Sequence, residues 1–166
     1  MAKRFRVSET FRQDKRVDLK NPYGRPEKYR SDTRCPACGL LYQDGVWKWK
    51  VPNARHALQS RLCPACIQIR DGRAGGVVEL DGSFTVSHRQ ELLNRIRNVE
   101  KQTLSERPLE RIISLKAAKN QIVVSATTEH LIARIGKAIR RDFGGTLDLK
   151  YAPEDKFATA RWHRDL

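Results

Sequence analysis

The hydrophobic and polar positions in the C-terminal third of the chain follow a strand, strand, helix, strand, strand pattern. Short apolar runs predict strands over residues 111–116, 121–126, 146–149 and 157–162. Between the second and third strands, apolar residues recur at helical spacing from Leu131 to Phe143. We expect Thr127 or Thr128 to cap this helix and Gly144-Gly145 to end it. The pattern therefore predicts a small ββαββ domain over residues 109–166, with one helix covering the sheet.

The middle of the chain combines a short strand pattern with a longer helical one. Two apolar runs, residues 77–80 and 84–86, flank an Asp-Gly pair, which predicts a β-hairpin. Ser87 followed three residues later by Gln90 is a capping-box pattern, and it predicts a helix that runs to about Glu106. Its apolar stripe consists of Leu92, Leu93, Ile96 and Val99. Residues 77–108 are therefore expected to form a hairpin and a connecting helix.

Residues 34–76 have the pattern of a small β-ribbon. Residues 40–51 predict a strand or hairpin in which Trp47 and Trp49 share one face, while Lys48 and Lys50 share the other. Because such a ribbon has little else to bury, both indole rings are expected in a small core. The segment over residues 53–61 predicts one or two helical turns, and the segment over residues 70–76 predicts a flexible basic loop.

Residues 1–33 are polar and basic and contain few aliphatic side chains. This composition predicts an arm that is disordered when free and becomes ordered on a partner. Its aromatic residues alternate with charged ones, a combination that suits contact with phosphates and stacking on bases. The alternative is a solubilising tail without a binding role. The four segments together predict an α+β fold with a basic arm, a ribbon, a connecting segment and a ββαββ domain.

All four cysteines of the chain lie in two matched Cys-Pro-Ala-Cys motifs, at residues 35–38 and 63–66. Two residues between paired cysteines let both sulfurs turn toward one point, and two such pairs supply the four thiolates of a tetrahedral site. Four ligands without a fifth candidate indicate a closed site that maintains shape. We therefore predict a zinc ribbon with one structural Zn²⁺ held by Cys35, Cys38, Cys63 and Cys66.

Other uses of the cysteines are also compatible with the motifs. A rubredoxin-like iron site uses the same motif, and its protein would be an electron carrier. Disulfides need an oxidising compartment, but residues 1–9 contain no apolar segment of a secretory signal. A redox-active Cys-x-x-Cys usually occurs once, beside a βαβ pattern. The sequence therefore favours zinc and a cytoplasmic location.

The net charge of +14, from 33 Lys and Arg against 19 Asp and Glu, indicates a polyanionic partner, with nucleic acid as the first candidate. The excess is six charges in residues 1–34, four in residues 35–75, zero in residues 76–108 and four in residues 109–166. The alternatives are a well-solvated basic surface and, in the C-terminal helix, cations that complement the helix dipole. The expected phosphate contacts are Lys3, Arg4, Arg6, Arg12, Lys15, Arg16, Lys48, Lys50, Arg55, Arg70, Arg73, Arg134, Lys137, Arg140 and Arg141.

The sequence contains no P-loop, GxGxxG, HExxH or GxSxG motif, and no apolar run long enough to cross a membrane. It therefore predicts that the protein is not an enzyme. It also predicts neither a membrane partner nor a small-molecule substrate.

The order Cys-Pro-x-Cys-Gly, aromatic hairpin, Cys-Pro-x-Cys resembles the N-terminal zinc region of the large-ribosomal-subunit nuclear export adaptor family. The segment Thr-Thr-Glu-His-Leu-Ile-Ala-Arg at residues 127–134, which opens a helix after a strand, is similar to the next domain of that family. The resemblance extends from about Thr33 to Trp162. It implies binding to the large ribosomal subunit through contacts to rRNA, with ribosomal proteins as further candidate partners.

The chain contains a single four-cysteine site, and we expect no C-terminal shuttling extension of the kind found in that family. We therefore expect a short prokaryotic-type relative that binds rRNA in ribosome assembly, translation or its regulation, and not an export factor. The closest alternative is a DNA-binding zinc ribbon of the kind found in transcription factors.

Overall fold

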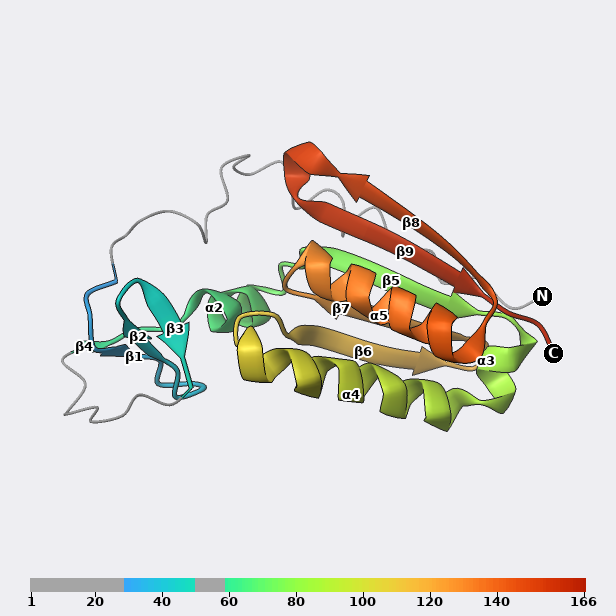
Figure 1. Cartoon of the computed structure of the whole chain (residues 1–166), viewed down its shortest axis with the longest axis horizontal. Helices are drawn as coiled ribbons and strands as arrows, with labels where there is room; N and C mark the ends of the chain where they lie inside the picture. Colours follow the sequence, from blue (N-terminus) through green and yellow to red (C-terminus); the bar gives the residue numbers. More distant parts are fainter. Residues whose placement is uncertain (1–28, 50–58) are drawn as a thin grey trace.

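The computed structural model of the chain describes residues 29–49 and 59–166, and Figure 1 shows them as a small ribbon beside a larger α+β unit. Residues 1–28 of the expected arm and the part of the expected helical turns before Gln59 lie outside the described residues. The end of the expected arm belongs to the ribbon instead, because Tyr29 packs against its apolar cluster and Thr33 is in a strand. None of the helices in the described ranges is both long and apolar enough to cross a membrane.

The ribbon is a sheet of four very short strands. Its strands are β1 (Thr33–Arg34), β2 (Leu41–Gln43), β3 (Val46–Lys48) and β4 (Gln59–Ser60). In the sheet they lie side by side in the order β3-β2-β1-β4. The antiparallel pair β2–β3 confirms the expected hairpin, whereas β4 runs parallel to β1. Gln59 and Ser60 form a strand instead of the expected helical turn, because their backbone pairs with Thr33 and Arg34.

Trp47 and Trp49 have different surroundings, although both were expected in the ribbon core. Trp47 is buried, and its ring centroid lies 4.9 Å from that of Tyr29 and 5.3 Å from that of Tyr42. Because β3 ends at Lys48, strand alternation does not determine the direction of Trp49, whose surface is 40% exposed. The expectation is confirmed for Trp47 and wrong for Trp49.

The second cysteine motif opens a helix, α2 (Pro64–Asp71). Pro64 occupies the first turn, where a missing N–H costs no hydrogen bond, and the Sγ atom of Cys63 accepts from the N–H of Cys66. Gly72 ends the helix in the left-handed conformation, with φ of 65°. The first two residues of the expected flexible loop, Arg70 and Asp71, are therefore helical.

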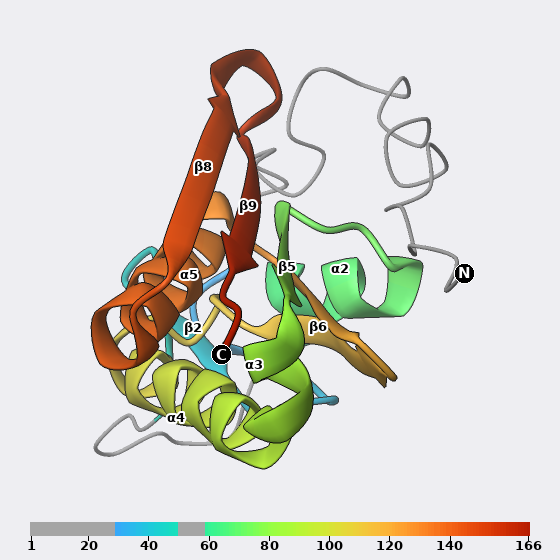
Figure 2. The same ribbon diagram turned by 90° about the vertical axis from the view of Figure 1, so that its right-hand side faces the viewer.

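The α+β unit is a five-stranded sheet with its two long helices on one face, as Figures 1 and 2 show. Its elements are β5 (Gly76–Asp81), α3 (Ser83–Ser87), α4 (Arg89–Glu106), β6 (Ile112–Ala118), β7 (Gln121–Ala126), α5 (Glu129–Phe143), β8 (Thr146–Ala152), the 3-10 turn η2 (Pro153–Asp155) and β9 (Phe157–His163). The strand order is β6-β7-β5-β9-β8. Strands β5 and β9 are parallel, and the other neighbours are antiparallel.

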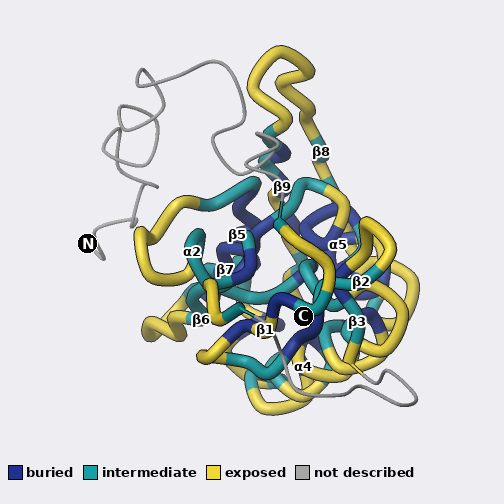
Figure 3. Tube along the Cα trace, turned by 90° about the vertical axis from the view of Figure 1, so that its left-hand side faces the viewer, coloured by how far each residue is buried: buried dark blue, intermediate teal, exposed yellow. Residues whose placement is uncertain are grey.

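Strand β5 lies at the centre of the sheet, which corrects the expected hairpin over residues 77–86. It pairs with β7 along one edge and with β9 along the other, so neither edge is left for a hairpin partner. The chain leaves β5 through Gly82, at φ of 101°, and Phe84 and Thr85 are helical residues of α3. The sheet expected from the ββαββ pattern thus gains a fifth strand, and Figure 3 shows β5 and β7 as buried segments within the unit.

Both long helices have a boundary where the sequence predicts one. Helix α4 ends at Glu106, as expected, and α5 ends at Phe143, as expected. The N-cap of α5 is Thr128, whose hydroxyl oxygen accepts from the N–H of Leu131 at 3.2 Å. The expected capping box is wrong, because Ser87 is the last residue of α3 and α4 begins at Arg89.

The main core lies between α5 and the sheet. Ile132, Ile135 and Ile139 are fully buried there. Trp162 of β9 is also fully buried, and its indole N–H donates to the carbonyl oxygen of Gly144 at 2.7 Å. Burial of each such aliphatic side chain stabilises the fold by about 1.5–3 kcal/mol. The α+β unit therefore has an apolar interior of its own.

Replacement of Gly82 by alanine is expected to destabilise the α+β unit. A Cβ atom at this position would lie 2.1 Å from the carbonyl oxygen of Arg164, at a φ that alanine rarely adopts. We expect the free energy of unfolding in urea to fall by at least ~2 kcal/mol. Gly72→Ala is the matched control, because Gly72 also has positive φ but faces open space; its expected cost is about 1 kcal/mol. Equal losses in both variants would contradict the steric role of Gly82.

Candidate metal centre

The two Cys-Pro-Ala-Cys motifs meet at one end of the ribbon. The first lies between β1 and β2, and the second forms the start of α2. The four Sγ atoms all lie within 4.8 Å of one another, and those of Cys38 and Cys63 are 3.7 Å apart. Zn–S bonds of about 2.3 Å at tetrahedral angles place sulfur atoms about 3.8 Å apart. The predicted convergence of the cysteines is confirmed, and the cluster is compatible with one zinc ion.

The backbone of the first motif turns back on itself to direct both sulfurs to the same point. The N–H of Cys35 donates to the carbonyl oxygen of Leu40 at 2.8 Å, and the N–H of Gly39 donates to that of Cys35 at 2.9 Å. Gly39 has φ of 81°, a conformation that a residue with a side chain adopts only with strain. The glycine after the second cysteine of the motif therefore closes the loop.

The centre is closed by protein ligands. Cys35 and Cys63 are fully buried, while Cys38 and Cys66 are partly buried. Across residues 29–49 and 59–166, no histidine, aspartate or glutamate joins the four-cysteine cluster. An ion with four protein ligands has no open position for a substrate, which is the arrangement of structural sites.

The surroundings of the sulfurs affect their thiol pKa values differently. Burial raises the pKa of Cys35, but hydrogen bonds from backbone N–H groups, that of Cys63 first, outweigh it and lower the pKa to about 6. Burial raises the pKa of Cys66, and burial together with the nearby charge of Cys38 raises the pKa of Cys63. Four adjacent thiolates therefore need a compensating cation, and a divalent metal ion meets that need.

The α+β unit contributes a positive charge to this centre. Arg111, just before β6, donates from Nη2 to the Sγ of Cys38 at 3.2 Å and from Nη1 to the Sγ of Cys66 at 3.4 Å. Its Nε donates to the carbonyl oxygen of Pro108 at 2.8 Å, and its guanidinium carbon lies 5.3 Å from the ring centroid of Trp49. Sequence reasoning missed Arg111, because nothing in its distance along the chain from the cysteines indicates a contact.

Three further contacts join the ribbon to the α+β unit near the cysteines. The indole N–H of Trp49 donates to the carbonyl oxygen of Leu104 at 2.7 Å, at the end of α4. The side-chain amide of Gln68 donates to the carbonyl oxygen of Thr127 at 3.0 Å. Leu109 packs against the apolar cluster of the ribbon. The four-cysteine centre therefore lies at the junction of the two units.

The expected phosphate contacts have different surroundings. Lys48, Arg70, Arg134 and Arg141 each lie beside a carboxylate of the chain, respectively Asp44 at 4.0 Å, Asp71 at 2.9 Å, Glu110 at 2.9 Å and Asp142 at 2.7 Å. Arg73, Lys137 and Arg140 are exposed. The other expected contacts, Lys3, Arg4, Arg6, Arg12, Lys15, Arg16, Lys50 and Arg55, lie outside the described residues.

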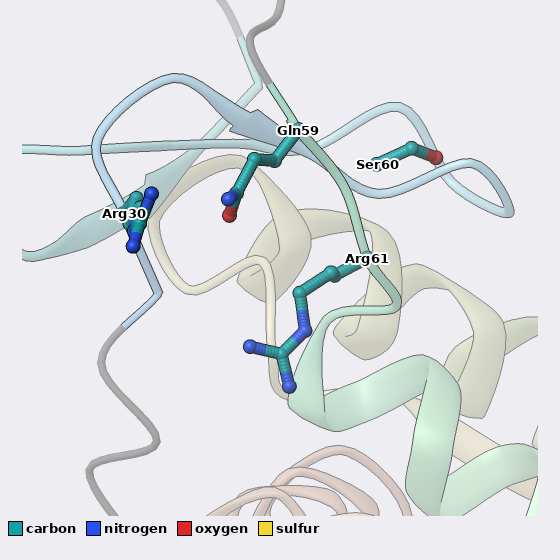
Figure 4. Close-up of a pocket in the computed structure, with 4 residues that line it drawn as sticks. All are labelled: Arg30, Gln59, Ser60 and Arg61. Carbon is teal, nitrogen blue, oxygen red and sulfur yellow. The ribbon is translucent and has the colours of Figure 1, made fainter.

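An open cavity of about 500 Å³ lies beside β4, lined by Arg30, Gln59, Ser60 and Arg61 (Figure 4). The parallel pairing of β1 and β4 brings the two arginines to one opening. Neither was expected to contact phosphate, because the sequence does not indicate that these strands pair. In Figure 4 the Ser60 side chain points away from the other three, so two guanidinium groups and an amide form the donor set, which suits an anion.

Removal of the metal is expected to unfold the ribbon and leave the α+β unit folded. Structural zinc contributes on the order of 10–16 kcal/mol of apparent binding energy in small motifs. The described part of the ribbon buries a small apolar cluster around Leu40, Trp47 and Ala65. Elemental analysis should find one zinc ion per chain. A chelator should abolish the dispersed amide NMR signals of the ribbon and retain those around Trp162. Cys63→Ser should have the effect of the chelator, and Ser60→Ala on exposed β4 should not. Dispersed ribbon signals in the metal-free protein would contradict this prediction.

No protein-family model, curated protein or solved structure matches this chain. The assignment of the centre therefore depends on its four sulfur ligands and on their surroundings.

Proposed function

We propose that this protein is a zinc-stabilised RNA-binding protein that acts on the large ribosomal subunit, in its assembly, in translation or in their regulation. The observation that carries the proposal is the net charge of +14 on a chain with a closed four-thiolate centre. A closed centre maintains shape and offers no position to a reactant, so charge-based binding is the activity that this composition favours. The resemblance of the cysteine order and of residues 127–134 to the export adaptor family supports rRNA as the polyanion.

Exposed cations on both units support the proposal. Arg97 and Lys101 of α4, and Lys137 and Arg140 of α5, are exposed and form no ion pair with another described residue. On the ribbon, Arg30 and Arg61 line one open cavity. Because every nucleotide of an RNA strand carries a phosphate, cations separated along the protein surface can all contact one folded RNA.

The proposal includes no catalytic activity and assigns zinc, not iron, to the centre. Among the residues that the structure describes, the cysteines form the one cluster of three or more potential metal ligands. Iron absorbance and a reversible redox wave in the purified protein would support an electron carrier instead. Metal-dependent RNA cleavage that a point change abolishes would support a nuclease.

Sedimentation of a cell lysate tests the proposed partner. On a sucrose gradient at low salt, the protein is expected to co-sediment with the large ribosomal subunit, and brief RNase treatment should release it. Co-purification with RNA polymerase and a preference for duplex DNA would support the transcription-factor alternative. A protein that stays at the top of the gradient would contradict ribosome binding.

The affinity for rRNA is expected to depend on salt and on exposed helix cations. Each neutralised phosphate adds about 0.9 to the slope of log K against log salt for duplex DNA, and A-form RNA should behave comparably. Five contacts would reduce the affinity on the order of 10³-fold between about 50 and 200 mM salt. Lys137→Glu with Arg140→Glu should weaken binding at least ~10-fold and reduce the slope by about two. Filter binding or fluorescence anisotropy with purified large subunits measures both values.

The matched control is Lys116→Glu with Lys119→Glu, which makes the same charge change on β6 and the turn that follows it. It should change the affinity less than the α5 variant does. Equal effects would indicate a nonspecific response to total charge. Salt-insensitive binding of the unaltered protein would indicate contacts to ribosomal protein instead of RNA.

A further inference from the structure

We infer that Arg111 couples metal occupancy of the four-cysteine centre to the docking of the ribbon on the α+β unit. Its guanidinium group, which belongs to the α+β unit, donates hydrogen bonds to cysteine sulfurs of the ribbon. Loss of the metal that holds these sulfurs should therefore separate the ribbon from the α+β unit. The inference rests on the metal centre of the proposed function but is independent of RNA binding.

The geometry of Arg111 requires both cysteine motifs to be in place. One Nη atom donates to Cys38 of the first motif at 3.2 Å, and the other donates to Cys66 of the second at 3.4 Å. The planar guanidinium presents these donors in a fixed fork, which the point charge of a lysine does not reproduce. The acceptors of this fork are the Sγ atoms of Cys38 and Cys66. A metal ion that fixes the distance between these two sulfurs therefore keeps both hydrogen bonds possible at once.

The remaining contacts of Arg111 anchor it between the units. Its Nε donates to the carbonyl oxygen of Pro108 at 2.8 Å, within the α+β unit, and its guanidinium lies over the ring of Trp49, within the ribbon segment. Trp49 donates in turn to the carbonyl oxygen of Leu104 at 2.7 Å, back in the α+β unit. The arginine and the indole thus form reciprocal contacts across the junction.

The charges favour the same coupling. A divalent ion with four thiolates has a net charge of −2, and hydrogen bonds between ionised partners are stronger than neutral ones. Within the described ranges, Arg111 is the residue whose cationic side chain donates to the cysteine sulfurs. Removal of a group that hydrogen-bonds to a metal ligand changes metal affinity by about 10–100-fold. Metal binding and docking should therefore strengthen each other.

Some contacts between described residues join the two units without involving the cysteine sulfurs. Besides the contacts of Arg111 and Trp49, the hydrogen bond from Gln68 to Thr127 and the packing of Leu109 join them there. The strands of the ribbon are two or three residues long. A ribbon that loses its metal therefore loses the positions of the Arg111 acceptors at the same time.

The test compares the zinc-loaded full-length chain with Arg111→Gln, Arg111→Lys and the control Arg107→Gln. Arg107 is exposed and pairs with Glu110, so its replacement removes the same charge away from the sulfurs. Backbone ¹⁵N relaxation reports whether the ribbon and the α+β unit tumble as one body. Hydrogen exchange of the Trp49 indole N–H reports its bond to Leu104. Competition with a chelator reports zinc affinity, and elemental analysis first verifies one zinc ion in each sample.

We expect one tumbling body and a protected indole N–H in the unaltered chain and in Arg107→Gln. In Arg111→Gln, the ribbon should keep its own dispersed signals, tumble faster than the α+β unit, exchange the Trp49 proton at least ~10-fold faster and lose zinc about 10–100-fold more readily. Arg111→Lys should retain more zinc affinity than Arg111→Gln but still loosen the docking, because it keeps the charge without the fork. If Arg111→Gln does not retain a folded ribbon, the tumbling and indole exchange of Arg111→Lys decide the question.

The coupling is overturned if, with zinc bound in every sample, the two units of Arg111→Lys tumble as one body and its Trp49 indole N–H exchanges at the unaltered rate. That result would leave the proposed RNA binding untouched. If the purified protein is fully folded, with the ribbon docked, but contains no metal, both the coupling and the zinc centre are overturned. Failure to bind the ribosome, with the coupling intact, would overturn only the proposed partner.

Discussion

The ribbon depends on the convergence of four cysteine sulfurs within 4.8 Å of one another. Its strands contain only two or three residues, and its apolar cluster is small, so neither pairing nor burial alone supplies the free energy that an ordinary domain gains. The sulfurs also define where the ribbon meets the rest of the protein, since Arg111 and Trp49 make their contacts beside them. The cysteine cluster and the junction of the two units therefore depend on the same contacts. The α+β unit differs, because its five-stranded sheet and two long helices enclose a large core.

Several cationic side chains of the described residues have a structural use. Arg134 bonds to Glu110 and Thr103, and Arg161 pairs with the buried carboxylate of Glu79. Arg111 interacts with sulfur instead of a carboxylate. These guanidinium groups are already hydrogen-bonded within the protein, and they would have to break those bonds to contact a phosphate. The net charge therefore overstates the number of cations that are available to a polyanion. Exposed cations such as Lys137 and Arg140 are better candidates for phosphate contacts than a count along the sequence suggests.

The elements that follow a regular period were predicted well. The ends of α4 and α5, the hairpin of β2 and β3, and the strands β6 to β9 appear close to their expected positions, because an amphipathic pattern reports which face an element buries. The strand expected over residues 77–80 is confirmed by β5, whereas the hairpin partner expected over residues 84–86 and the expected burial of Trp49 were wrong. In both cases the local pattern was compatible with several partners, and the actual partner is distant in the chain. Strand β5 pairs with β7 and β9, and the Trp49 indole bonds to Leu104.

The sequence by itself determined the α+β class, the extents of the two long helices and the four cysteines that form the cluster. These features depend on spacing between near neighbours, which the covalent chain imposes directly. The tertiary structure decided the central place of β5, the cavity formed where β1 and β4 pair, and the contact of Arg111 with Cys38 and Cys66. Each of these brings together segments that the chain connects only through the rest of the fold. Their contacts follow from how whole elements pack, and no local pattern of residues specifies that packing.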